Sequence, residues 1–145
     1  MPRASKPKPT FRVNILDAGV MTKGGRVYPP ELVAKLAADI NEHPVTVEEV
    51  SPLERKVKKV PICYSWPEHA MAVSQNAEVE DGKLFVNFAI KGNKYGKLLK
   101  TVLDANSPGR VAFKPVVIGD DAPDGTMTSA KISYVTFEVK PDGPT

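Results

Sequence analysis

Apolar and polar residues alternate with a period of two near the start of the chain and with helical spacing soon afterwards. The alternation over residues 11–16 predicts a first strand. Gly19, Gly24 and Gly25 then mark a loop, and Pro29-Pro30 opens a helix, because proline is tolerated in a first helical turn. One apolar stripe on this helix is formed by Leu32, Val33, Leu36, Ala37 and Ile40.

The middle of the chain carries a hairpin signal followed by a second helical pattern. Residues 77–80 and 83–90 are strand-like, and they flank Asp81-Gly82, a dipeptide that favours a two-residue hairpin turn. The helix that follows ends at Asn106-Ser107-Pro108-Gly109. Its apolar stripe comprises Tyr95, Leu98, Leu99, Val102 and Leu103. We expect both helical stripes and the hairpin to supply the core.

Residues 43–66 have a weaker pattern. His43-Pro44 ends the first helix, and the valines at 45, 47 and 50 allow a short strand. Pro52 and the basic residues after it indicate an exposed loop. Alternation over residues 60–64 predicts another strand, which a corner at Trp66 follows. We interpret Trp66 as a buried anchor of that corner.

The last third predicts two strands, at residues 110–118 and 126–139, and Pro115 makes the first of them an edge or bulged strand. Strands and helices do not alternate steadily, which argues against a parallel sheet. We therefore predict one α+β domain over residues 11–141, with a mostly antiparallel sheet or small β-barrel and two packed amphipathic helices. Residues 1–10 form a basic, proline-rich arm in this interpretation, and residues 142–145 a tail.

Composition narrows the class of protein. The 145 residues suit one domain with a core, and 41% apolar with 26% charged residues is typical of a soluble globular chain. No apolar run approaches the roughly 18–20 residues of a membrane span, and no apolar segment follows the basic N-terminus as in a secretory signal. Cys63 is a single cysteine, and no Cys/His cluster has zinc-ligand spacing. We expect no metal and no other cofactor.

Charge is unevenly distributed along the chain. A net charge of +3 is too small to indicate nucleic-acid binding, and 7% aromatic content lacks the interleaving with basic residues that single-strand binding uses. Two basic clusters stand out, and they are either solvated surface or docking sites for an acidic partner surface. The clusters are Arg3, Lys6 and Lys8 in the arm, and Arg55, Lys56, Lys58 and Lys59 further along.

Known catalytic sequence motifs do not identify a reaction for this chain. The chain has no phosphate-binding Gly-rich loop, no Gly-x-Ser-x-Gly elbow and no His-Glu-x-x-His motif. Its two histidines are His43, which we interpret as structural at a helix end, and His69, which follows the corner at Trp66. A lone histidine is more often structural than catalytic, so the residue type leaves the role of His69 open.

The order of several short motifs resembles the tailed-phage prohead (capsid maturation) protease family over roughly residues 11–141. Residues 23–29, Lys-Gly-Gly-Arg-Val-Tyr-Pro, resemble the family's Asn-Gly-Arg-x-Tyr-Pro segment, and His69 falls where the family places its catalytic histidine. Residues 81–84 resemble its hairpin turn, Gly96-Lys97 its helix start, and residues 137–141 its closing strand with an acidic residue. The resemblance implies the fold that this family shares with herpesvirus assemblins, an antiparallel β-barrel flanked by helices.

The resemblance also implies a set of site positions. A serine nucleophile needs a histidine base that a third group orients, and the carried-over base is His69 with Glu138 as candidate orienter. The serine is expected within residues 111–114, where the best match is Ala112, which has no hydroxyl. Two explanations of Ala112 stay open: the chain is naturally inactive, or its serine was replaced. As a third possibility, a shifted alignment makes Ser107 the nucleophile, although Ser107-Pro108-Gly109 also fits a helix stop.

Three functions follow from these expectations. The first is a non-catalytic capsid cement or decoration protein, capsid-bound or oligomeric, in the phage head after assembly in the host cytoplasm. The second is a prohead maturation serine protease in inactivated form, which cuts scaffold and capsid-protein arms. The expected partners are the major capsid protein, the scaffold protein or both, with no membrane and no specific nucleic acid. The third is an unrelated soluble α+β binding module.

Overall fold

A computed structural model describes residues 9–22, 24–106 and 110–139, and its centre is one six-stranded sheet. The strand order is β1-β4-β3-β2-β6-β5, and every pair is antiparallel except β2 with β6. The strands are β1 (Thr10–Asp17), β2 (Thr46–Val47), β3 (Ala72–Glu80), β4 (Lys83–Ile90), β5 (Val111–Ile118) and β6 (Lys131–Val139). The helices are α1 (Pro30–Glu42), α2 (Pro52–Lys58), the short 3-10 helix Pro67–His69, and α3 (Lys94–Ala105).

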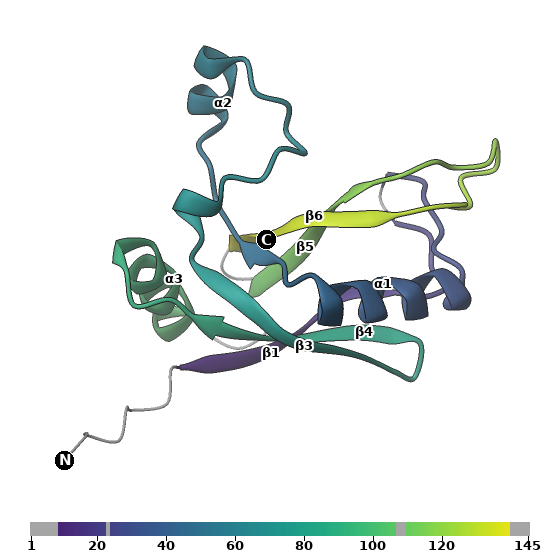
Figure 1. The fold of residues 1–145 in the computed structure, drawn as a ribbon, viewed down its shortest axis with the longest axis horizontal. Coiled ribbons are helices and arrows are strands. Elements are labelled where there is room, and N and C mark those ends of the chain that lie inside the picture. Colours follow the sequence, from purple (N-terminus) through teal and green to yellow (C-terminus); the bar gives the residue numbers. More distant parts are fainter. Residues whose placement is uncertain (1–8, 23, 107–109, 140–145) are drawn as a thin grey trace, which may run out of the picture.

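The sheet curls so that its first and last strands come close together (Figure 1). The ring centroids of Phe11 on β1 and Phe113 on β5 lie 5.2 Å apart, and Phe11 also stacks on Phe88 of β4 at 5.5 Å. The result is a nearly closed, barrel-like sheet of mixed but mostly antiparallel strands. This arrangement confirms the predicted α+β class.

The core lies between α1 and the concave side of the sheet (Figure 1). All five residues of the stripe predicted for α1 are buried. Along β4, alternate residues Leu84, Val86 and Phe88 are fully buried, as expected for a strand with one face on the core. The buried stripe on α1 confirms the prediction for that helix.

The predicted hairpin is the β3–β4 pair. Asp81 and Gly82 both have positive φ, 52° and 75°, as in a two-residue hairpin turn of type I′. The strands pair from Glu80↔Lys83 to Ala72↔Ile90, so β3 begins five residues before the segment that alternation indicated. At the other side of the sheet, β5 is a terminal strand with a register irregularity at Val116/Val117, which agrees with the expected effect of Pro115.

The segment between α1 and β3 differs from the prediction. Residues 52–58 form α2 and not a loop. Pro52 is compatible with this helix, because it stands in the first turn, where no amide hydrogen is needed. Residues 60–64 form no strand. Their carbonyl oxygens accept hydrogen bonds from side chains, so the segment is bonded without a neighbouring strand. The last strand is also shorter than predicted, since β6 begins at Lys131.

The apolar stripe predicted for α3 is only partly buried. Leu99 is fully buried, whereas the adjacent Leu98 is 57% exposed, which corrects the expectation that both face the core. Consecutive helical residues point about 100° apart, so a helix that touches the sheet along a narrow strip buries one of them. None of the helices in the described ranges is long and apolar enough to cross a membrane.

Candidate functional site

An open cleft of about 840 Å³ lies between α2, α3 and the end of β6. Its apolar lining comes from Met71, Tyr95, Leu98, Val102, Phe137 and Val139. Its polar lining is Glu49, Ser51, Glu54, His69 and Glu138. The cleft therefore combines apolar walls with three carboxylates and one histidine, and no lysine or arginine lies among these lining residues.

His69 lies at the end of the 3-10 helix, with its ring between two aromatic side chains. The ring stacks on Tyr95 at a centroid distance of 5.0 Å and meets the edge of Trp66 at 5.3 Å. Trp66 is 4% exposed, which agrees with its interpretation as an anchor of this corner. Within residues 9–22, 24–106 and 110–139, the His69 ring makes no hydrogen bond or ion pair. Packing against these two aromatic side chains positions the ring at the cleft.

Glu138 and Ala112 are direct partners across the β5–β6 pair. Directly paired residues project from the same face of a sheet, so both side chains lie on one side of this hairpin. Lys114, two residues after Ala112, also projects from that side, and its Nζ lies 3.0 Å from Oε1 of Glu138. The fold thus places Glu138 beside Ala112 and in the same cleft as His69, whereas Ala112 is not among the cleft-lining residues.

Glu48 is a buried carboxylate that sequence analysis missed. Its side chain is fully buried and accepts hydrogen bonds from the Trp66 backbone N–H, from the Ser65 hydroxyl at 2.6 Å, and from the Thr46 hydroxyl. These bonds tie β2 to the corner that carries His69. The one sequence signal was a glutamate directly after the alternating valines of a short strand.

Arg55 corrects the expectation of an exposed four-residue basic cluster. Its side chain is buried and donates to the carbonyl oxygens of Pro61 at 2.7 Å and Tyr64 at 3.1 Å, and to the Tyr134 hydroxyl at 2.8 Å. A guanidinium presents several donors in a fixed plane, which suits it to bonding several acceptors at once. Arg55 therefore stabilises the 59–66 segment and is not available for docking.

The remaining docking candidates of this cluster, Lys56, Lys58 and Lys59, are exposed. Lys58 pairs with Glu54 one helical turn earlier at 3.2 Å. The candidates in the arm, Arg3, Lys6 and Lys8, lie outside the described residues, as does Ser107. In the part of the chain that the structure describes, no group of three or more His, Cys, Asp or Glu side chains is placed to hold a metal ion.

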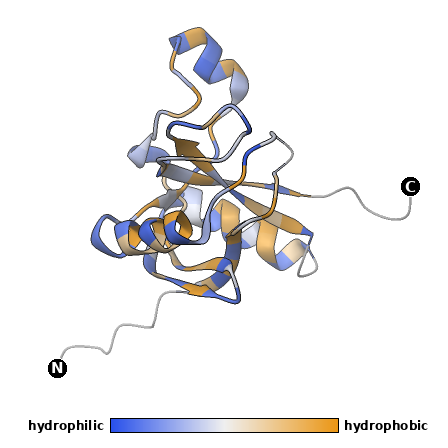
Figure 2. Ribbon diagram, turned by 90° about the vertical axis from the view of Figure 1, so that its right-hand side faces the viewer, coloured by the Kyte–Doolittle hydropathy of each residue, from blue (hydrophilic) through white to orange (hydrophobic). Residues whose placement is uncertain are grey.

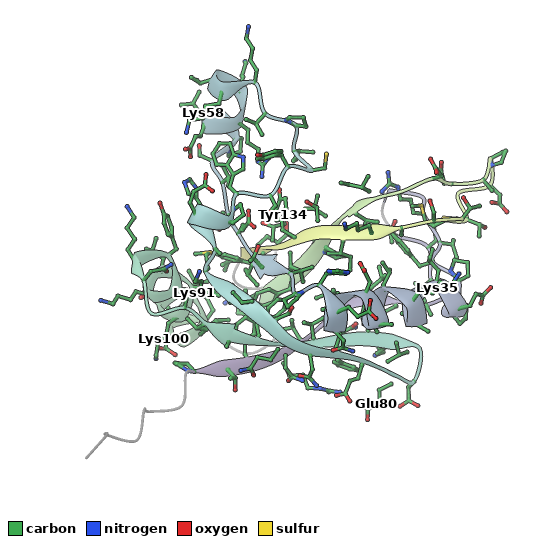
Figure 3. The ribbon with its side chains drawn as sticks, viewed as in Figure 1. Lys35, Lys58, Glu80, Lys91, Lys100 and Tyr134 are labelled. Carbon is green, nitrogen blue, oxygen red and sulfur yellow. The ribbon has the colours of Figure 1, made fainter. Side chains whose placement is uncertain are left out.

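Tyr134 projects from β6 toward the 59–66 segment (Figure 3), where its hydroxyl donates to the Ile62 carbonyl oxygen at 2.7 Å. Burial raises the pKa of the Tyr134 phenol above its ordinary value of 10.0, although the nearby Arg55 charge acts in the opposite direction. The fold therefore favours the neutral phenol. Its contribution to stability is fully present below pH 10.0 and is lost as the pH rises through the higher pKa of the folded state.

We expect the stability of the protein to fall more steeply at alkaline pH than that of a Tyr134→Phe variant, which has no phenol to ionise. The measurement is the free energy of unfolding in urea at about pH 9 and about pH 11 for both chains. Equal losses in the two chains would contradict the assignment.

Comparison with known proteins bears on the fold of this chain. No protein-family model matches the sequence, and no curated protein sequence matches it. Among solved structures, the chain is similar to the bacteriophage T4 capsid assembly protease, gp21, with a TM-score of 0.69 and 18% sequence identity over 97% of this chain and 88% of that chain. The chain thus has a prohead-protease-like fold.

Proposed function

We propose that the chain is a phage head protein that keeps a prohead-protease-like fold as a non-catalytic capsid component, of the cement or decoration type. Ala112 carries the proposal, because it stands beside Glu138 at the strand position expected for the nucleophile and has neither hydroxyl nor thiol. Nucleophilic catalysis needs such a group. The proposed partner is the major capsid protein or the scaffold protein, and the proposed location is the phage head.

The other residues of the cleft support this proposal. Ser51 is the single hydroxyl-bearing serine or threonine among the cleft-lining residues. It precedes the first turn of α2, and its carbonyl oxygen accepts the Arg55 N–H at 3.1 Å. In the described part of the chain, no hydrogen bond joins His69 to Ser51, and Glu138 is paired with Lys114. The nucleophile, base and orienter of a serine protease are linked by such bonds.

A specific observation also favours a second candidate, the maturation protease in inactivated form. His69 and Glu138 line one cleft, and Ala112 lies directly opposite Glu138 on the neighbouring strand. In that case one substitution, Ala112→Ser, completes the set of catalytic side chains. The two candidates therefore differ in what this substitution does.

For the non-catalytic role we expect Ala112→Ser to remain without protease activity on phage scaffold and capsid proteins, while the original chain co-sediments with mature capsids. Ala105→Ser, a matched change at an exposed position on α3, is the control. If Ala112→Ser gains cleavage that His69→Ala abolishes, the non-catalytic role is wrong and the inactivated protease is correct. Gel analysis of the substrates and sedimentation with capsids give both readouts.

A further inference from the structure

Helix α2 stands away from the sheet (Figure 1). It exposes large apolar side chains. Leu53 and Val57 are 68% and 71% exposed, and their spacing of four residues places them on one side of the helix. Figure 2 shows hydrophobic and hydrophilic residues interspersed along this outlying helix. Exposed apolar side chains that polar residues surround are typical of interaction surfaces.

The position of α2 is fixed by buried polar contacts. Arg55 connects the helix to the 59–66 segment, and Tyr134 connects that segment to β6. The Ser133 hydroxyl adds a bond to the Cys63 carbonyl oxygen. Because these hydrogen bonds hold the inner side of α2, the helix presents its outer apolar side in a defined orientation. A preorganised surface loses less conformational entropy when it binds.

The cleft has the properties that would accept such a helix. It is lined by apolar side chains that include Leu98, itself 57% exposed, and by the carboxylate of Glu49. Its other two carboxylates already have lysine partners, since Glu54 pairs with Lys58 and Glu138 with Lys114. An amphipathic helix binds a groove through apolar residues spaced three or four apart. Basic residues beside such a helix would also match the charge of Glu49. Helix α2 carries Lys56 beside Leu53 and Val57, and Lys59 follows at its C-terminal cap.

We propose that two copies of this chain form a symmetric dimer in which α2 of each copy packs into the cleft of the other. Ser51 and Glu54 line the cleft, so α2 is one wall of the cleft in its own copy. When each α2 packs into the cleft of the other copy, both copies therefore contribute the same surface to one continuous interface. A self-complementary surface of this kind generates closed two-fold symmetry. The dimer covers the cleft that contains His69, and it is independent of the capsid role proposed above.

Sedimentation velocity of the full chain tests the dimer. We expect a species of twice the 15.7 kDa chain mass at micromolar concentration. Val57→Asp places a charge in the contact and is expected to raise the dissociation constant about tenfold or more. Val79→Asp is the matched control, because Val79 is 41% exposed on β3, remote from α2 in the sheet. Both variants should keep the melting temperature of the original chain, since both positions are exposed.

Paired charge reversals give a second test that is specific to this geometry. A Lys56→Glu/Lys59→Glu variant and a Glu49→Lys variant should each dimerise more weakly than the original chain. An equimolar mixture of the two should form a heterodimer, because each contact then joins opposite charges again.

The expected dimer of α2 and the cleft forms at micromolar concentration, so a chain that stays monomeric up to about 100 µM would overturn the proposal. A dimer that Val57→Asp leaves unchanged would also overturn it. A monomer whose capsid binding is lost in Val57→Asp would assign this face of α2 to another protein and reject the dimer, while leaving the capsid role standing.

Discussion

Replacing Glu48 by alanine is expected to lower the free energy of unfolding by about 2 kcal/mol or more, because a buried donor left without an acceptor costs roughly 1–3 kcal/mol and two half-buried hydroxyls lose a charged partner as well. The Trp66 N–H and the hydroxyls of Ser65 and Thr46 all donate to this carboxylate. Its removal leaves all three without their partner at once. Urea unfolding of the two chains, followed by circular dichroism, measures the difference.

The adjacent residue supplies the control for Glu48→Ala. Glu49 is exposed and lines the open cleft, so Glu49→Ala should change stability by no more than about 0.5 kcal/mol. The His69 ring should also respond, since Glu48 holds the corner that precedes it, and its proton resonances should shift in a stable Glu48→Gln variant. Equal stability of Glu48→Ala and Glu49→Ala would show that the bonds to Glu48 do not support the fold.

Leu36→Ala is expected to destabilise the protein by about 2–5 kcal/mol, the range for a fully buried leucine whose removal leaves a cavity. Leu36 is 1% exposed on α1. Leu98→Ala should cost less than about 0.5 kcal/mol, because Leu98 on α3 is mostly exposed and its truncation opens no cavity. The sequence pattern alone predicts similar losses of stability for the two variants, whereas the structure predicts a large loss only for Leu36→Ala. Thermal unfolding of both variants distinguishes these expectations. A large loss in Leu98→Ala would contradict the orientation of α3.

Elements with a strong local signal were predictable from the sequence. Helix α1 has five apolar residues at helical spacing, and the β3–β4 hairpin has a turn dipeptide that adopts positive φ without strain. Both signals depend on neighbours within a few residues. Leu98 was misplaced because periodicity defines an apolar stripe but not how wide a strip the sheet covers.

The polar interior was not predictable, since its partners are remote in the sequence. Arg55 bonds to Tyr134, and Glu48 bonds to the Trp66 corner. Charged residues are rarely buried unless they are paired, so a basic run is ordinarily interpreted as solvated surface. The alternation at Val45 and Val47 would direct Glu48 to solvent on a one-sided sheet. Here the corner at residues 65–66 covers the side of the sheet on which Glu48 lies. The residues next to Glu48 in the sequence do not indicate this contact.

The pairing of β1 has a consequence for how the chain folds during its synthesis. Leu16 pairs with Leu84, and among the described strands only β4 hydrogen-bonds to β1 in the sheet. At about 5–20 residues per second on a ribosome, β1 waits several seconds before β4 emerges. The β3–β4 hairpin joins strands that are adjacent in the sequence and can form as soon as β4 emerges. Closure by β1 is a long-range step, which makes slow, late docking of the first strand the expected folding order.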